Sequence, residues 1–155
     1  MAKGEKRSAA RLSAVQALYQ MDIAATPLPE IFAQFEAFWM GQEVEGEEYK
    51  PAEAAFFRSI VEGVLREQRV LDPEIDSTLA GGWPLRRVEA IMRAILRAGG
   101  WELRFRRDIP PRVVIAEYVD IAHAFFDKDE VGMVNAVLDA LARKLRSDEL
   151  ARKDG

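Results

Sequence analysis

Few side chains in this sequence could carry out catalysis or hold a metal ion. The single histidine, His123, has Asp120 three residues before it, a spacing that favours a hydrogen bond within one helix over a metal site. Asp127 and Asp129 lie two residues apart, but no glutamate follows at the distance that completes a calcium loop. Both aspartates are instead expected at the start of the next helix, whose dipole favours acidic groups there.

Motifs for common cofactors are also missing from the sequence. It has no phosphate-binding loop, no dinucleotide-binding glycine motif and no zinc-protease motif. Because it has no cysteine, it has no thiolate metal ligand, cysteine nucleophile or disulfide. These observations predict that the protein is not an enzyme and uses no metal or cofactor. Its surface charges are the remaining candidates for function.

The start of the chain is basic although the whole chain is acidic. Lys3, Lys6, Arg7 and Arg11 stand against Glu5, whereas the full sequence has 22 Lys and Arg, 26 Asp and Glu and a net charge of −4. Four-residue steps place Lys3, Arg7 and Arg11 on one stripe of a helix, about 120° from its apolar face. We expect this stripe to face solvent, where it could bind phosphate groups. A merely solvated helix end has the same pattern, and charge does not separate the two.

A second basic cluster lies further along the chain. Four of its arginines fall at the beginning and middle of a long predicted helix and three at its end: Arg86, Arg87, Arg93, Arg97, Arg104, Arg106 and Arg107. The last three are typical of cations at a helix C-terminus. The first four could serve a protein interface, in which arginine is enriched, or simply face solvent. Their spacing does not choose between these roles.

The elements that position these residues are all predicted to be helices. Apolar residues recur at steps of three and four, no segment alternates like a strand, and the helices are expected over residues 8–23, 29–40, 51–68, 72–80, 84–106, 111–126 and 130–146. The first helix is expected to bury the face that carries Leu12, Val15, Tyr19 and Ile23. Gly99 and Gly100 interrupt the long helix and are expected to let a neighbouring helix approach closely. An acidic linker is expected over residues 41–50.

Length and composition are typical of one globular domain. The chain has 155 residues, of which 49% are hydrophobic and 31% charged, so it can bury a substantial core. No apolar run is long enough to cross a membrane, and no signal-peptide block opens the chain. We therefore expect a soluble, cytoplasmic, all-α protein of about seven helices in one compact bundle.

Two stretches resemble a known family. The segment AARLSAVQALYQMD resembles the opening helix of the NusB transcription antitermination family. The segment AILRAGGWELRFRRDIPPRVVIAEYVDIAHAFF, followed by VNAVLDALAR, resembles its C-terminal signature. The resemblance spans nearly the whole chain and is weakest at residues 42–50. It implies one NusB-like RNA-binding domain over residues 1–155, in two packed helical subdomains: an N-terminal half (1–82) and a C-terminal half (83–147), with a tail (148–155).

The resemblance implies a function without catalysis. A NusB-like protein would pair with NusE, a small-subunit ribosomal protein, and bind the boxA element of nascent ribosomal RNA. It would thereby help RNA polymerase, within an antitermination complex, to pass termination signals. A homodimer is a further possible assembly.

The resemblance also implies site residues. The arginine-rich motif falls on Arg7 and Arg11, with Ser8 and Ala9 at positions that are often basic and Lys3 and Lys6 nearby. Further RNA-binding positions match Asp129 and Met133, the latter standing where some relatives have a stacking aromatic. Positions facing the protein partner match Met92, Arg93, Leu96 and Arg97.

Two alternatives remain at this stage. One is a helical adaptor that binds only proteins and whose basic residues increase solubility. The other is an RNA-binding domain like that at the N-terminus of ribosomal RNA cytosine methyltransferases. The second is disfavoured because the chain lacks a cysteine nucleophile and ends at Gly155 without a methyltransferase domain.

Overall fold

The computed structural model describes residues 3–41, 51–79 and 88–147. These residues form six α-helices and no strand: α1 (Lys3–Ala24), α2 (Leu28–Gly41), α3 (Pro51–Asp76), α4 (Ala90–Phe105), α5 (Pro111–Phe125) and α6 (Lys128–Leu145). The prediction of an all-α fold with about seven helices is therefore confirmed. No helix in the described part of the chain is long and apolar enough to cross a membrane.

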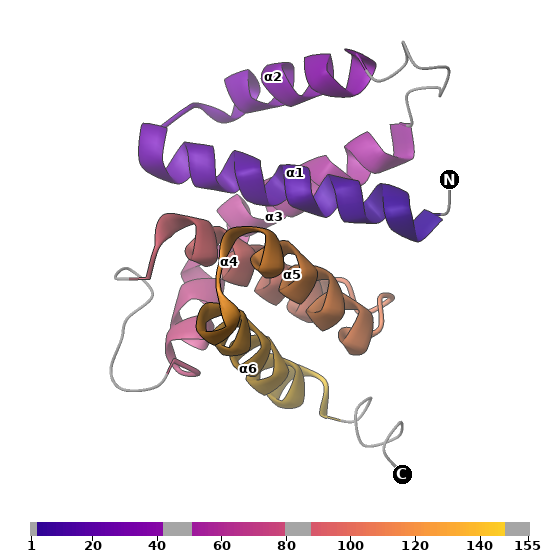
Figure 1. Cartoon of the computed structure of the whole chain (residues 1–155). Helices are drawn as coiled ribbons and strands as arrows, with labels where there is room; N and C mark the ends of the chain where they lie inside the picture. The colour runs from indigo at the N-terminus through magenta and orange to yellow at the C-terminus, as the bar shows by residue number, and fades with distance from the viewer. Residues whose placement is uncertain (1–2, 42–50, 80–87, 148–155) are drawn as a thin grey trace.

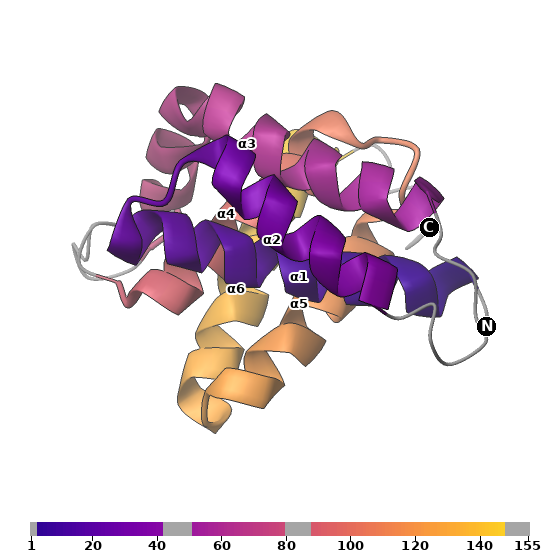
Figure 2. The same ribbon diagram turned by 90° about the horizontal axis from the view of Figure 1, so that it is seen from above.

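Helix α4 lies in the middle of the bundle. It packs against α1 and α3 on one side and against α5 and α6 on the other. Helix α2 covers α1 and the beginning of α3 (Figures 1 and 2). Helices α5 and α6 form an antiparallel pair joined by a short turn, with α6 leading down to the C-terminus in Figure 1. Side chains from all six helices share one continuous core.

Three helix boundaries differ clearly from the predicted ones, the first being the start of α1, which begins at Lys3 and not at residue 8. Helix α3 runs on through Pro73 to Asp76, so the separate helix expected over residues 72–80 is wrong. Leu71 and Ile75 are both buried and hold this last stretch on the core, which offsets the hydrogen bond that a proline cannot donate. Helix α4 begins only at Ala90, because Glu89 has an extended backbone. Residues 42–50 and 80–87, which include most of the predicted acidic linker, lie outside the described residues.

The buried face of α1 is only partly the predicted one, since Val15 is buried as expected. The face toward α3 and α4 is built mainly from small side chains, namely Ala10, Ala14, Val15, Ala17 and Leu18. Leu12, Tyr19 and Ile23 are exposed instead. Small side chains let neighbouring helices approach closely, so this face buries a compact surface although the bulkier residues lie elsewhere.

Glycines mark close contacts between helices. A Cβ atom on Gly99 would lie 2.9 Å from Cδ2 of Leu138 in α6, which confirms the packing role predicted for this position. Gly100 is also buried, but a Cβ atom there would make only ordinary contacts. A third packing glycine, Gly63 in α3, was not anticipated: a Cβ atom there would overlap the indole ring of Trp101.

Arg146, just after α6, holds the connector between α4 and α5. Its buried guanidinium donates hydrogen bonds to the backbone carbonyls of Glu102 (2.8 Å), Leu103 (2.7 Å), Arg106 (2.7 Å) and Ile109. Carbonyls at the end of a helix have no partner within that helix. One side chain therefore supplies the donors for the end of α4 and for the connector that follows it.

Helix α1 ends in a left-handed turn that glycine would fit better. Ala25 has φ = 54°, and its N–H donates to the carbonyl of Met21 at 3.1 Å. We expect Ala25→Gly to raise the free energy of unfolding by about 0.5–1 kcal/mol, because relief of backbone strain exceeds the entropy that glycine adds to the unfolded chain. Urea unfolding measures this difference, and a lower midpoint for the variant would contradict it.

Candidate functional site

The basic residues at the start of α1 divide into two groups. Lys3 and Lys6 lie in the first turns of α1, and their side chains lie outside the described part of the structure. Arg7 is half-buried, and its guanidinium carbon lies 5.1 Å from the centre of the Phe56 ring. Arg11, by contrast, is only 1% exposed. The expectation that Arg11 faces solvent on the same stripe is therefore wrong.

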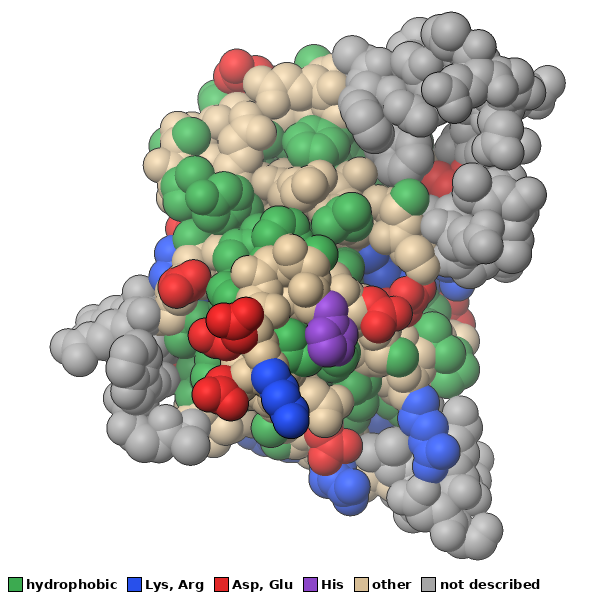
Figure 3. All heavy atoms as spheres, viewed as in Figure 1, with side chains coloured by type: hydrophobic (Ala, Val, Ile, Leu, Met, Phe, Trp, Pro, Cys, Tyr) green, Lys and Arg blue, Asp and Glu red, His purple; other side chains and the backbone are tan. Residues whose placement is uncertain are grey.

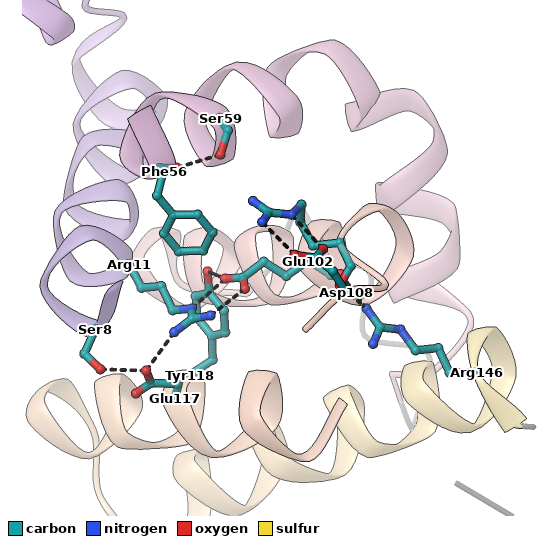
Figure 4. Close-up of polar contacts among 10 residues, drawn as sticks. Ser8, Arg11, Phe56, Ser59, Glu102, Asp108, Glu117, Tyr118 and Arg146 are labelled. Atoms are coloured by element: carbon teal, nitrogen blue, oxygen red, sulfur yellow. Dashed lines mark hydrogen bonds and ion pairs between the residues drawn. The ribbon is translucent and has the colours of Figure 1, made fainter. Parts of the chain in front are cut away.

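A buried network of charges explains the position of Arg11. Its guanidinium pairs in a two-pronged arrangement with Glu102 of α4, with Nε and Nη2 at 2.8 and 2.9 Å from the two carboxylate oxygens (Figure 4). Nη1 donates to Oε1 of Glu117 on α5 at 2.7 Å. Two carboxylates thus pull this side chain inward, although it occupies a position of the arginine-rich motif.

Hydroxyl groups complete this network. Tyr118 is fully buried and its hydroxyl donates to Glu102, while Ser8 donates to Oε1 of Glu117 at 2.6 Å (Figure 4). Burial, together with the charge of Glu102, raises the pKa of Tyr118 well above its ordinary value. Burial would lower the pKa of Arg11, but hydrogen bonds and charge from Glu102 outweigh it and raise that pKa. The network therefore joins α1 to α4 and α5 and keeps Arg11 charged.

Exposed aromatic rings lie on α1 and at the end of α5. Tyr19 is 37% and Phe125 42% exposed, so the expectation that Tyr19 belongs to the core is wrong. Hydrophobic side chains gather over α1 on the face shown in Figure 3, with acidic side chains beside the turn between α5 and α6. The Phe125-Phe126 pair could have revealed an exposed ring, because consecutive helical residues point about 100° apart.

The two predicted positions on α6 lie in its first two turns. Asp129 is exposed in the first turn, and Met133 is partly buried against the core. Asp127 is the residue that precedes α6, as expected, but its side chain makes no capping hydrogen bond.

The predicted partner-facing residues on α4 lie on two different faces. Met92 is 3% exposed and Leu96 is fully buried, so the structure places both in the core, and their part in partner binding stays a prediction. The reason is the helix period, which turns both toward the core, whereas Arg93 and Arg97 lie half-buried at the surface.

Arg93 and Arg97 connect α4 with the end of α1 and with α3. Arg93 pairs with Asp22 at 2.9 Å and donates to the Val88 carbonyl. Arg97 forms a two-pronged pair with Asp72, both distances being 2.9 Å, and lies 3.8 Å from Asp22. Both guanidiniums are thereby fixed in position at the surface.

A pocket of about 310 Å³ lies beside these ion pairs. Its walls come from the end of α1, the middle of α3 and α4, and are formed by Leu18, Met21, Asp22, Ala25, Thr26, Val64, Leu65, Gln68, Ala94 and Arg97. Apolar and polar side chains, among them Asp22, Gln68 and Arg97, line the pocket together, and Leu65 is itself exposed. The pocket could accept a side chain of another molecule.

Comparison with known proteins identifies the family. A sequence model of the NusB family matches residues 8–143. The chain belongs to the NusB family. The transcription antitermination protein NusB of Rhodopseudomonas palustris (strain ATCC BAA-98 / CGA009) is 65% identical over 150 residues, covering 97% of this chain and 86% of that protein. NusB of Nitrobacter hamburgensis is 61% identical and covers 97% and 94%.

Solved structures of NusB proteins have the same fold. T. maritima NusB superimposes with a TM-score of 0.75 at 25% identity, covering 94% of this chain and 96% of that one. A structure of antitermination factors NusB and NusE in complex with dsRNA gives 0.74 at 24% identity, covering 93% and 99%. The NusB resemblance seen in the sequence is thereby confirmed. Since NusB proteins are transcription factors, the prediction that the chain is not an enzyme is confirmed as well.

Proposed function

We propose that this chain is a transcription antitermination factor that, together with NusE, binds the boxA element of nascent ribosomal RNA. In this role it helps RNA polymerase to pass termination signals, and it acts in the cytoplasm. The observation that carries the proposal is the family match over residues 8–143, with a relative named as an antitermination protein at 65% identity.

The start of α1 supplies the electrostatic part of RNA binding. Lys3, Lys6 and Arg7 lie on its first turns, and phosphate contacts by such residues position RNA without specifying its sequence. Arg11 has a different role, because its donors are directed at Glu102 and Glu117. It fixes α1 on the bundle and so positions the basic turns that precede it.

Exposed rings and polar groups supply contacts to bases. Proteins recognise single-stranded RNA largely by stacking its bases on aromatic side chains. Tyr19 and Phe125 present such rings, Asp129 offers an exposed hydrogen-bond acceptor, and Met133 can pack against a base although it cannot stack like a ring.

The protein partner docks at the surface formed by Arg93, Arg97 and the adjacent pocket. Ion pairs hold both arginines in place, so little side-chain entropy is lost on binding. The pocket receives a side chain of NusE, and the buried Met92 and Leu96 support this surface from beneath.

Fluorescence anisotropy of a labelled boxA RNA tests the RNA-binding role. We expect the chain to bind boxA more tightly than a scrambled RNA, with NusE strengthening and salt weakening the binding. Arg7→Glu should weaken binding severalfold, whereas Arg66→Glu, the same charge change at an exposed position on α3, should have little effect. Binding that ignores both RNA sequence and NusE would contradict this role and favour a protein-binding adaptor.

Partner binding is tested separately by calorimetric titration with NusE. We expect Arg93→Glu to weaken the affinity at least severalfold, because it removes a cation from the surface and its pairing with Asp22. Arg143→Glu on α6 serves as the control, since Arg143 is exposed and also pairs with an aspartate. If thermal unfolding shows both variants folded and their NusE affinities are equal, Arg93 has no part in the interface.

A further inference from the structure

We propose that Arg7 of α1 and Arg106, the residue after α4, form one phosphate-binding site for RNA, built around the ring of Phe56 in α3. RNA would then run from the start of α1 onto the connector between α4 and α5. This inference rests on the proposed RNA-binding function and adds a site on a second part of the fold.

The Phe56 ring gathers arginines from separate elements. The guanidinium carbons of Arg7, Arg11 and Arg106 lie 5.1, 5.0 and 5.2 Å from its centre. Phe56 itself is buried, so its own position is fixed by the core. Cation–π contacts at these distances are favourable, and stacking leaves the N–H groups of a guanidinium directed outward in its plane. The ring therefore brings like charges from α1 and the end of α4 to one place.

These three arginines differ in how far their donors are already used. Arg11 is occupied by Glu102 and Glu117, and these two carboxylates balance its charge. Within the described part of the chain, Arg7 contacts the Phe56 ring and pairs with no carboxylate. The side chain of Arg106 is 26% exposed and pairs with Asp108 through Nε and Nη2, at 3.0 and 2.9 Å. Arg7 and Arg106 are thus the two members that an RNA strand can reach.

The carboxylate of Asp108 now stands at the position that we expect a phosphate group to take. Its hydrogen bonds to Arg106, and the nearby charges of Arg106 and Arg7, lower its pKa to about 2. The same donors of Arg106 suit a phosphate group, whose oxygens accept from a guanidinium in the same two-pronged way. Because Asp108 is exposed, its ion pair with Arg106 contributes little to stability and can be exchanged for a phosphate.

The surroundings of the site favour a polyanion over a protein partner. Arg107 on the connector and Arg112 in the first turn of α5 are both exposed cations, and Lys3 and Lys6 lie on α1. Cations drawn from two segments suit the repeating negative charge of an RNA backbone.

Three substitutions test this site with labelled boxA RNA, titrated in the presence of NusE at several salt concentrations. We expect Arg106→Ala to weaken binding severalfold and to reduce the slope of log K against log salt by about 0.7, the value for one phosphate contact on a single strand. Phe56→Leu, which keeps an apolar side chain but removes the ring, should weaken binding similarly. Asp108→Asn should strengthen it severalfold, because it removes the competing carboxylate.

Arg104→Ala is the matched control, since Arg104 lies in the last turn of the same helix but pairs with Glu74 at 2.9 Å. It should leave RNA affinity unchanged, and circular dichroism should show all four variants folded. Wild-type preference for boxA together with unchanged binding by Arg106→Ala, or with weaker binding by Asp108→Asn, overturns this site and leaves the proposed function intact. If the wild type shows no preference for boxA, the site and the proposed function both fail.

Discussion

Glu102→Leu is expected to lower the free energy of unfolding by about 3–5 kcal/mol, which is typical when one partner of a buried ion pair is removed. The substitution leaves Arg11 buried with Glu117 as its remaining partner, and the buried hydroxyl of Tyr118 loses its acceptor. Urea unfolding followed by circular dichroism measures the loss. We expect the variant to unfold at a clearly lower urea concentration than the wild type.

A double-mutant cycle separates this network from simple packing. Arg11→Met combined with Glu102→Leu removes both charges and keeps apolar bulk, so the double variant should be more stable than Glu102→Leu alone. Additive losses in the two single variants would contradict a coupled pair. A fully stable Arg11→Met variant that bound RNA poorly would instead show that Arg11 contacts RNA, contrary to its buried position.

Gly63→Ala is expected to destabilise the protein by about 2–3 kcal/mol, or to prevent folding. A methyl group at this position would overlap the indole of Trp101, which is itself buried between α3 and α4, and overpacking of this kind costs about 1–3 kcal/mol or more. The loss outweighs the gain of about 1 kcal/mol in helix propensity that alanine brings. Thermal and urea unfolding measure the net effect.

Gly132→Ala provides the matched control in α6. A Cβ atom there meets nothing within 4 Å, so only the gain in helix propensity applies and stability should rise by up to about 1 kcal/mol. Opposite signs for the two glycine variants would establish that contact with Trp101 decides the effect. Equal changes in both would show that the α3–α4 contact adjusts freely.

The helical class and most helix boundaries could be predicted from the sequence because they depend on local signals. Pro111 begins α5 at the predicted residue, and α5 and α6 are separated at residues 126–127, close to the break predicted at residues 127–129. The separate helix expected over residues 72–80 was wrong, because the burial of Leu71 and Ile75 keeps this stretch in line with α3. Burial depends on neighbours that a local pattern does not contain.

The candidate site was harder to predict, for the same reason. Arg11 lies four residues after Arg7 and was therefore expected to be equally exposed. Two carboxylates, 91 and 106 residues away in the sequence, instead keep its side chain buried. The spacing of apolar residues predicted that the bulky Leu12, Tyr19 and Ile23 are buried, whereas the packed face of α1 is rich in alanine. On α4, family resemblance supplied four neighbouring positions but not the face on which each lies. Arg93 and Arg97 stay predictions for the partner interface, and Met92 and Leu96 belong to the core.

The hydrogen bonds of Arg146 have a consequence for the order in which the protein folds. This residue reaches back 37–44 positions along the chain to bind the end of α4 and the connector after it. During synthesis the connector therefore has no lasting shape until the last turn of α6 has emerged and docked, since a loop of this length must close first. That connector carries Arg106. A nascent chain that does not yet include Arg146 would therefore present the basic turns of α1 without Arg106 in its final position. We therefore expect the two halves of the proposed RNA site to come together only after Arg146 has docked.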